Sequence, residues 1–487
     1  MILLWIALIS FPIATSSLIP RETLISSAEN IWTTYLSPDG KFIGFIAHDD
    51  NNIRNVFSMR SSDLYKRQLT FEKRNVLSFA WTGVEDLILF EQDNHGDENS
   101  MIFKLNISEQ VITYEPTIVF NVIGVKAMIL GDTTSKDYVL IALNNDIPSY
   151  HNVYKFDLFT NELTLVFLNN RFSISNIFVD NDLNIRLAKE DQEDGSTVFF
   201  RLSGNANAGV LNSDAEHWKE YIRVEQDDIQ LSKFVKFDKS NENVYFLTSE
   251  GTDLGCLVIA PYNNFTERRV IYFAEKAELQ LDLYHPVDHT ILALTEDYNK
   301  PEFVFVNDTV ADDLTYLADF RPTGSFDILS VSNDMSLWLV TYRSSEKPRE
   351  IFIYRRYLKS IELLFKTNRE LENYKLNNQI GFDFVARDGL RIQAYLSLPP
   401  NTPLKSLEDV SDEDKDLAEK GLIPEEPQKL VLRVHGGPHG RDIYHFDNGN
   451  AFLTSRGYAV MQVNFRGSSG FGKALLNSGN GEWSRKV

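Results

Sequence analysis

Cysteine is almost absent from this sequence. Among 487 residues there is one, Cys256, so the chain cannot form a disulfide within itself. Cys256 lies in the apolar run 256–260, which predicts that it serves as a small buried hydrophobic residue. The fold must therefore be stabilised by packing.

Positive charge is also in deficit. The 48 lysine and arginine residues are outnumbered by 69 aspartate and glutamate residues, which gives a formal net charge of -21. Such a chain repels polyphosphate and anionic lipid, so we predict that neither nucleic acid nor an anionic membrane surface is a partner.

Long apolar runs are missing after the N-terminus. The first run, residues 2–14, is shorter than the ~20 residues that span a bilayer, and small residues follow it. We expect residues 1–17 to be a cleaved secretory signal peptide, with no membrane span left after its removal. A buried N-terminal strand or an uncleaved anchor is the alternative. With a signal, the protein would be secreted or lumenal in the secretory pathway, or periplasmic if it is bacterial.

Three sequons are candidates for N-glycosylation in a eukaryotic secretory pathway, at Asn106, Asn264 and Asn307. Three is about what chance gives in a chain so rich in asparagine. They add little to the case for secretion.

Long helical periodicity is missing between residues 31 and 365. The apolar runs there are short, rich in β-branched and aromatic residues, and bounded by Asp, Asn, Gly or Ser, which is typical of strands and tight turns. The runs recur as seven units, at residues 37–70, 80–114, 138–167, 177–221, 234–273, 281–317 and 326–365.

Sheets of three or four short strands at this period favour an all-β propeller of about seven blades, which we assign to residues 18–370. A pair of β-sandwiches is the alternative. In a propeller, Trp32, Trp81 and Trp338 would pack between neighbouring units.

The character changes after residue 366. A hairpin is predicted around the turn 387–389, and an acidic insert at 405–429 is expected to be a solvated loop or short surface helix. An apolar strand at 430–434, predicted to be buried on both faces, precedes a helix at 446–455 and a strand at 458–464. Residues 371–487 are therefore expected to form a separate α/β region rather than more propeller.

Recognisable metal-ligand sets are missing too. His435, His439 and His445 lie close in sequence, but Gly436-Gly437-Pro438 prevents the helix that would bring the first two onto one face. No carboxylate or thiolate completes a set, so we predict no metal site and no cofactor.

What is present is a glycine-rich loop, His435-Gly436-Gly437-Pro438, directly after the apolar strand. Two glycines let a ligand approach the backbone, and their amides could face a developing oxyanion. We name His435, Gly436 and Gly437 as oxyanion-hole candidates. A glycine-rich turn beside a hydrogen-bonded histidine is the alternative.

Several motifs occur in a fixed order across residues 385–483: Ala386-Arg387-Asp388-Gly389-Leu390, His435-Gly436-Gly437-Pro438, Asn464-Phe465-Arg466-Gly467-Ser468 and Gly481-Glu482-Trp483. In these motifs the chain resembles the prolyl oligopeptidase family (S9) of serine peptidases, nearest its acylaminoacyl-peptidase and dipeptidyl-peptidase-like branch. The resemblance implies a seven- or eight-bladed propeller covering an α/β-hydrolase domain, a Ser/Asp/His triad, and short peptides as substrates. It implies that residues 371–487 are the N-terminal part of this α/β-hydrolase domain, which would be incomplete. It also implies that Gly437, or Gly436, lends an oxyanion N–H, with His435 where other branches carry a tyrosine.

The nucleophile motif Gly-x-Ser-x-Gly is missing from the 487 residues. The closest stretch, Gly467-Ser468-Ser469, has Phe471 where the motif needs glycine, so we assign no catalytic residue. We expect this chain to be inactive and its last hundred residues to expose apolar strand edges.

Two readings of function follow from these observations. The first is the N-terminal part of a secreted serine peptidase that cleaves short peptides through an acyl-enzyme. The second is an inactive propeller that acts as a peptide-binding or interaction module. The sequence makes no prediction of oligomeric state.

Overall fold

The computed structural model describes residues 18–25, 31, 33–93, 96–108, 114–134, 136–203 and 209–485. The expected signal peptide, residues 1–17, lies outside the described residues. Within the described ranges, no helix is both long and apolar enough to cross a membrane.

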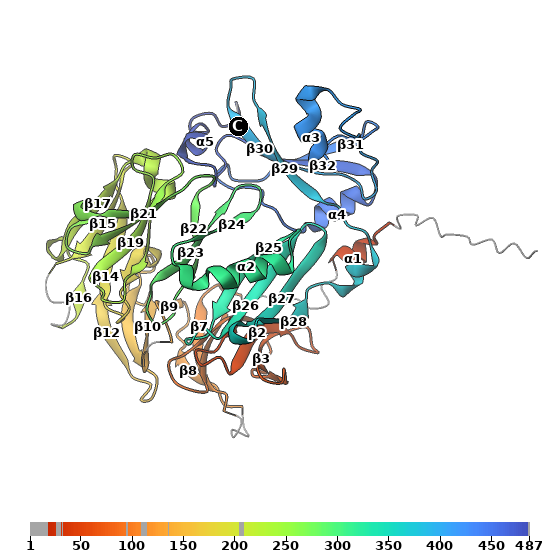
Figure 1. Ribbon diagram of the computed structural model, residues 1–487. Helices are drawn as coiled ribbons and strands as arrows, with labels where there is room; N and C mark the ends of the chain where they lie inside the picture. Colours follow the sequence, from red (N-terminus) through yellow and green to blue (C-terminus); the bar gives the residue numbers. More distant parts are fainter. Residues whose placement is uncertain are drawn as a thin grey trace, which may run out of the picture.

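Seven small, mainly antiparallel sheets come first in the chain, followed by an eighth, mixed sheet (Figure 1). Each of the seven is built almost entirely from one contiguous stretch, because tight turns return the chain beside itself. In the first sheet, for example, Gly40 adopts φ +72° and its amide closes a turn onto the Ser37 carbonyl at 2.9 Å.

The first four sheets are made of strands β1 to β17. Their bounds are β1 Thr34–Leu36, β2 Phe42–His48, β3 Arg54–Arg60 and β4 Lys66–Gln68; β5 Val76–Trp81, β6 Leu87–Asp93, β7 Ser100–Asn106 and β8 Thr117–Phe120; β9 Ala127–Leu130, β10 Tyr138–Leu143, β11 Asn152–Asp157 and β12 Leu163–Leu168, with β16 Leu211–Asn212 added in parallel; and β13 Ile177–Val179, β14 Ile185–Asp191, β15 Thr197–Leu202 and β17 Trp218–Val224.

The next three sheets are made of strands β18 to β28. Their bounds are β18 Lys233–Phe237, β19 Asn243–Thr248, β20 Cys256–Pro261 and β21 Arg269–Phe273; β22 Leu279–Tyr284, β23 Ile291–Asp297 and β24 Pro301–Phe305; and β25 Ser325–Val331, β26 Leu337–Ser344, β27 Lys347–Arg355 and β28 Ser360–Lys366.

Each of these sheets packs on the next, and the seventh packs on the first. Seven buried hydrophobic clusters lie between successive sheets, the last joining residues 31–59 to residues 339–365. The first and seventh sheets share no strand, but the Leu36 amide donates to the Ser330 hydroxyl at 3.0 Å. Cys256 is buried in the cluster between the fourth and fifth sheets, as predicted.

A central cavity of about 800 Å³ is lined by the first strand of every one of the seven sheets. Contacts between sheets are therefore made around a shared hollow, rather than face to face in two layers. This arrangement disagrees with the β-sandwich alternative.

The sixth repeat, predicted as strands to about residue 317, instead ends in a helix. After three strands the chain forms α2, Ala311–Phe320. Val310, Leu314 and Leu317 recur at helical spacing and are buried, while two aspartates in the first turn favour the helix N-terminus. The helical spacing of these three residues was not recognised in the sequence, because the rest of the repeat consists of strands.

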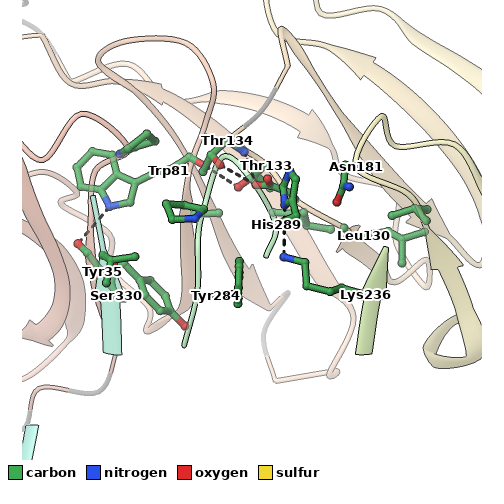
Figure 2. Close-up of a pocket in the computed structure, with 18 of the residues that line it drawn as sticks. Tyr35, Trp81, Leu130, Thr133, Thr134, Asn181, Lys236, Tyr284, His289 and Ser330 are labelled. Carbon is green, nitrogen blue, oxygen red and sulfur yellow. Dashed lines mark hydrogen bonds between the residues drawn. The ribbon is translucent and has the colours of Figure 1, made fainter. Parts of the chain in front are cut away.

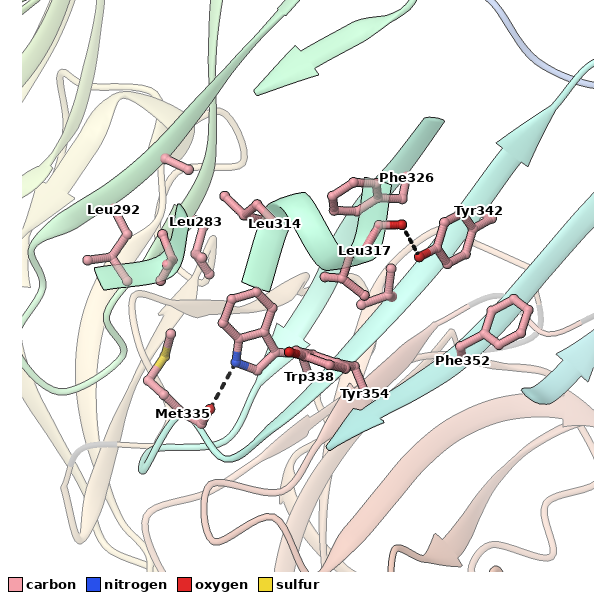
Figure 3. Packing of buried hydrophobic residues seen from close by; sticks show 13 residues of the cluster. Leu283, Leu292, Leu314, Leu317, Phe326, Met335, Trp338, Tyr342, Phe352 and Tyr354 are labelled. Atoms are coloured by element: carbon pink, nitrogen blue, oxygen red, sulfur yellow. Dashed lines mark hydrogen bonds between the residues drawn. The ribbon is translucent and has the colours of Figure 1, made fainter. Parts of the chain in front are cut away.

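Trp338 packs between the sixth and seventh sheets, as predicted (Figure 3). It is fully buried, its Nε1–H donates to the Met335 carbonyl at 2.9 Å, and its ring meets Tyr354 edge-on at 5.7 Å. Trp81 has the same role between the first and second sheets. Trp32 lies outside the described residues.

The eighth sheet has the order β29–β30–β32–β31, with β29 Gln379–Val385, β30 Arg391–Ser397, β31 Lys429–Arg433 and β32 Tyr458–Asn464. Strands β31 and β32 are parallel and are joined through α4, Asn448–Thr454, which confirms the expected strand-helix-strand unit. The acidic insert forms only a short helix, α3, Lys415–Glu419.

The prediction that the strand at 430–434 is buried on both faces is wrong. Strand β31 lies at the edge of the sheet, and the side chains of Leu430, Leu432 and Val434 are 55%, 57% and 64% exposed. The apolar sequence is that of an internal strand, but only β32 pairs with it among the described residues. The expectation of exposed apolar surface in this region is confirmed.

The N-terminal segment lies against the eighth-sheet region. Helix α1, Arg21–Ile25, contributes Leu24 to a cluster with Leu371, Leu376 and Ala451. The Asn368 amide also donates to the Thr23 carbonyl at 2.7 Å. Residues near the start of the chain thus help to hold the region after β28.

Replacing Asp313→Asn should lower the free energy of unfolding by about 2 kcal/mol at pH 7. The buried carboxylate accepts hydrogen bonds from Tyr354 at 2.6 Å, Arg356 at 2.7 Å and Lys359 at 2.5 Å, and these would be weakened. Urea unfolding measures the change. Asp312→Asn, at the neighbouring exposed position, is the matched control and should cost little.

This stabilisation should depend on pH. Burial acts to raise the pKa of Asp313, but hydrogen bonds from Lys359, Tyr354 and Arg356 hold it below its ordinary value. A lowered carboxyl pKa stabilises the fold above the unfolded-state pKa of about 3.9, and the effect is lost as pH falls through the folded-state pKa. An Asp313→Asn penalty that stays constant below about pH 4 would contradict this account.

Candidate functional site

The loop 435–440 follows β31 directly, and His435 is fixed at its start. The His435 ring stacks on Phe465 with centroids 4.4 Å apart. Its Nδ1 lies 2.9 Å from the Gly436 carbonyl and its Nε2 lies 2.9 Å from Ser468 Oγ. Nδ1–H can donate to the carbonyl, and the Ser468 hydroxyl can accept from or donate to Nε2, so both ring nitrogens have a partner.

The amides of Gly436 and Gly437 are open. Neither donates a hydrogen bond to any of the described residues. Gly437 has φ +140°, and a Cβ there would lie 2.6 Å from the backbone nitrogens of His439 and Gly440, whereas a Cβ at Gly436 would meet open space. Glycine is therefore required at position 437, whereas position 436 could also hold a side chain. Both N–H groups are free to donate a hydrogen bond to an oxygen atom of a ligand.

A second loop, residues 466–472, lies beside the first. His439 Nδ1 is 3.0 Å from the Gly467 carbonyl, and the Ser469 amide donates to the Gly440 carbonyl at 3.2 Å. A Cβ at Gly467 would lie 3.2 Å from Pro438. The two glycine-rich loops thus fix one another.

The fifth and sixth sheets anchor the second loop. Glu278 accepts hydrogen bonds from the Gly470 amide at 2.8 Å and the Gly472 amide at 3.1 Å. Burial raises the pKa of Glu278, and the two amides act against that rise. In α5, Lys473–Asn477, the Lys473 ammonium pairs with Asp228 at 2.6 Å. The seven-sheet region thereby positions the loop from outside.

Polar residues that sequence reasoning missed lie behind the loops. Asp442 Oδ1 accepts from Gln462 Nε2 at 2.7 Å, and the Asp442 amide donates to Asn464 Oδ1 at 2.7 Å. Asp442 Oδ2 is buried without a partner among the described residues. Burial raises the pKa of Asp442, while nearby His435 acts to lower it.

A signal for this network was visible in the sequence. Gln462 and Asn464 interrupt the apolar strand β32 at positions that proved to be buried. Buried polar side chains need partners, so two of them on one strand indicate a buried network.

Ser468 does not supply an accessible nucleophile. Ser468 is 0% exposed, and its hydroxyl is bound to His435. A nucleophile must reach the substrate carbonyl, so this serine instead holds the histidine ring in place. The contact between His435 and Ser468 was not predicted, since it joins positions 33 residues apart.

The central cavity carries a separate polar group (Figure 2). Lys236 Nζ lies 3.3 Å from His289 Nδ1 and 3.4 Å from the centre of the Tyr284 ring. Burial lowers the pKa of Lys236 to about 8. Lys236 lies near the end of β18 and His289 lies in the turn after β22, and these are the first strands of the fifth and sixth sheets. Glu278, which binds the second glycine-rich loop, lies just before the start of β22. The lysine group is therefore at the end of the cavity away from the eighth sheet.

The three sequons share a local structure. In Asn106, Asn264 and Asn307 the side-chain oxygen accepts from the amide two residues ahead, at 2.9, 3.1 and 3.0 Å. Asn106 is exposed and the other two are half-buried. Their glycosylation remains a prediction.

Within the part of the chain that the structure describes, no group of three or more His, Cys, Asp or Glu side chains is placed to hold a metal ion. His435, His439 and His445 each bind a nearby carbonyl through Nδ1.

Gly437→Ala should disrupt the loop, whereas Gly436→Ala should not. The first substitution forces a Cβ against backbone atoms at a φ that alanine rarely adopts, and should cost about 1–3 kcal/mol of unfolding free energy. Hydrogen exchange of residues 435–441, with urea unfolding, measures both variants. Equal behaviour of the two variants would show that the loop geometry described above is wrong.

Comparisons with known proteins agree with this architecture. A family model described as "Prolyl oligopeptidase family" matches residues 444–487. The chain is 48% identical over 474 residues to "Dipeptidyl peptidase family member 6" of Caenorhabditis elegans, covering 96% of this chain and 63% of that protein. It is 27% identical over 479 residues to "Dipeptidyl aminopeptidase BIII" of Pseudoxanthomonas mexicana, covering 98% of this chain and 65% of that protein. The chain thus spans slightly less than two thirds of these relatives.

Solved structures share the fold at low sequence identity. A puromycin-hydrolysing peptidase from Mycobacterium tuberculosis superposes with a TM-score of 0.66 at 12% identity, covering 96% of this chain and 71% of that one. Oligopeptidase B from Leishmania major gives 0.59 at 13% identity, covering 94% and 64%. These neighbours combine a propeller with a hydrolase domain. The family match and the two relatives show that this chain belongs to the prolyl oligopeptidase family.

Proposed function

We propose that these residues form the propeller and the oxyanion side of a serine peptidase that hydrolyses short peptides through an acyl-enzyme, of the acylaminoacyl or dipeptidyl type. The observation that carries the proposal is the pair of open amides at Gly436 and Gly437. They sit on a loop fixed by the His435 contact with Ser468 and by the neighbouring loop. Dipeptidyl-peptidase relatives support the substrate class.

The chemistry assigned to these residues is electrostatic. As a nucleophile attacks a peptide carbonyl, negative charge develops on its oxygen, and preorganised N–H groups stabilise that charge without reorganising. One such donor is typically worth about 10²–10³-fold in kcat. The His435 ring is fixed by its stacking on Phe465 and by two hydrogen bonds, and it thereby holds the Gly436 and Gly437 amides in position. No residue of the 487 is assigned as nucleophile or base.

The propeller is proposed to have seven blades, one for each small sheet, with the domain boundary between residues 370 and 371. The shared central cavity and the packing of the seventh sheet on the first support this division. Residues 18–25 are assigned to the propeller by that boundary, although α1 packs on the second domain.

Short peptides are the proposed ligands, and the secretory pathway, or the periplasm of a bacterium, is the proposed location. The location rests on residues 1–17 of the sequence.

A second candidate is a peptide-binding module without catalysis. It is favoured by one observation, the complete burial of Ser468. This serine contacts His435, but a substrate cannot reach it. The central cavity of about 800 Å³ could still receive a peptide.

The natural protein that carries this sequence, isolated from its source with an antibody, tests the proposal. Hydrolysis of dipeptidyl or acylaminoacyl aminomethylcoumarin substrates, abolished by a fluorophosphonate, is expected. Peptide binding without hydrolysis would contradict the peptidase and support the module.

A recombinant chain of these 487 residues should not be labelled by a fluorophosphonate probe, because Ser468 is buried and no other serine is assigned as a nucleophile. In-gel fluorescence, with an active serine peptidase as positive control, measures the labelling. A stoichiometric adduct at Ser468 or Ser469 would overturn the expectation.

A further inference from the structure

A second cavity, of about 730 Å³, lies between the seventh sheet and the eighth-sheet region. Its walls are strands β25 to β27, Leu24 and Ile25 of the N-terminal segment, and residues 443–448. Figure 1 shows these strands rising toward α1 and α4. Leu329 lines both this cavity and the central one, so the two adjoin on β25.

The lining of this cavity is positively charged in a chain that is strongly acidic overall. Arg343, Lys347 and Arg349 line it with one carboxylate, Asp327, and with His445. The whole chain has a formal net charge of -21. A local excess of cations at a concave, partly buried surface attracts anions.

The two arginines meet across the hairpin formed by β26 and β27. Arg343 lies between Tyr342 and Ser344, whose partners on β27 are Glu350 and Lys347, so a bulge places both Pro348 and Arg349 opposite it. Like charges at such positions repel each other and destabilise a sheet. An anion placed between them would offset that repulsion.

Only one of the two arginines has a carboxylate partner. Arg343 pairs with Asp327, yet its Nε is buried without a hydrogen-bond partner among the described residues. Arg349 donates from Nε to Thr341 Oγ1 at 2.9 Å and forms no ion pair within the described ranges. Burial lowers the pKa of Arg349, which is the effect of a charge held without enough compensation.

We propose that this cavity binds a carboxylate of a peptide, held by the guanidinium groups of Arg343 and Arg349. A planar guanidinium presents paired N–H donors that match the two oxygens of a carboxylate. The choice of a peptide as carrier rests on the proposed function, and it fits the position of this cavity beside the central one, with which it shares the lining residue Leu329. The site deepens that function by selecting peptides with a free acid group.

Calorimetric titration of the 487-residue chain with three blocked peptides tests the proposal. Acetyl-trialanine with a free C-terminus should bind, and its C-terminal amide should bind at least tenfold more weakly. Acetyl-Ala-Glu-Ala-amide distinguishes the sources: binding shows that a side-chain carboxylate is accepted, and failure assigns the site to the peptide C-terminus. Equal binding of the first acid and its amide overturns the proposal.

Variants locate the binding. Arg349→Gln should weaken binding of the free acid at least tenfold, and Arg349→Lys should give a smaller loss because charge remains while the paired donors are lost. Arg268→Gln, which removes the same charge from an ion pair in the fifth-sheet region, is the matched control and should bind as the parent does. Unchanged affinity in Arg349→Gln overturns the assignment.

The outcome is separable from that of the proposed function, because binding is measured on a chain that needs no turnover. If the natural protein hydrolyses peptides but the titration shows no preference for the acid over the amide, only the carboxylate site is contradicted. Acid-selective binding without hydrolysis would remove only the peptidase.

Discussion

The structure depends on the need of each small sheet to bury two faces. A sheet of three or four short strands has no interior of its own, so it is stable only against neighbours on both sides. Seven hydrophobic clusters meet this need in succession, and the last one joins the ends of the repeat through Phe45, Ile351 and Phe365. Because no disulfide contributes, the arrangement depends on complementary packing at every junction.

The eighth sheet is held to this ring by polar contacts at one end of the strands. Glu278 binds two amides of the second glycine-rich loop, Asn299 accepts from Gln393, and Arg441 donates to the Asp297 carbonyl. These contacts come from turns and from the end of strand β23, whose positions are set by the sheets. The geometry of the open amides is therefore a property of both regions together, although the amides belong to one short loop.

Local sequence pattern predicted what depends on local order. Alternating apolar runs gave the strands, and His435-Gly436-Gly437-Pro438 marked the loop with the open amides. Helix α2 was missed because its short period lies inside a strand-rich repeat, and the edge position of β31 was misjudged because apolar composition does not reveal how many strands pair with it. The facing of Arg343 and Arg349 depends on hairpin register, and the His435 contact with Ser468 depends on tertiary structure, so neither was readable beforehand.

The lone cysteine gives the protein a built-in reporter. Cys256 lies in the cluster shared by the fourth and fifth sheets, and burial raises the pKa of its thiol. Alkylating reagents attack the thiolate, so they reach this side chain only when that junction opens. The rate of modification of the folded 487-residue chain thus records the opening of this one interface, because these residues contain no second thiol.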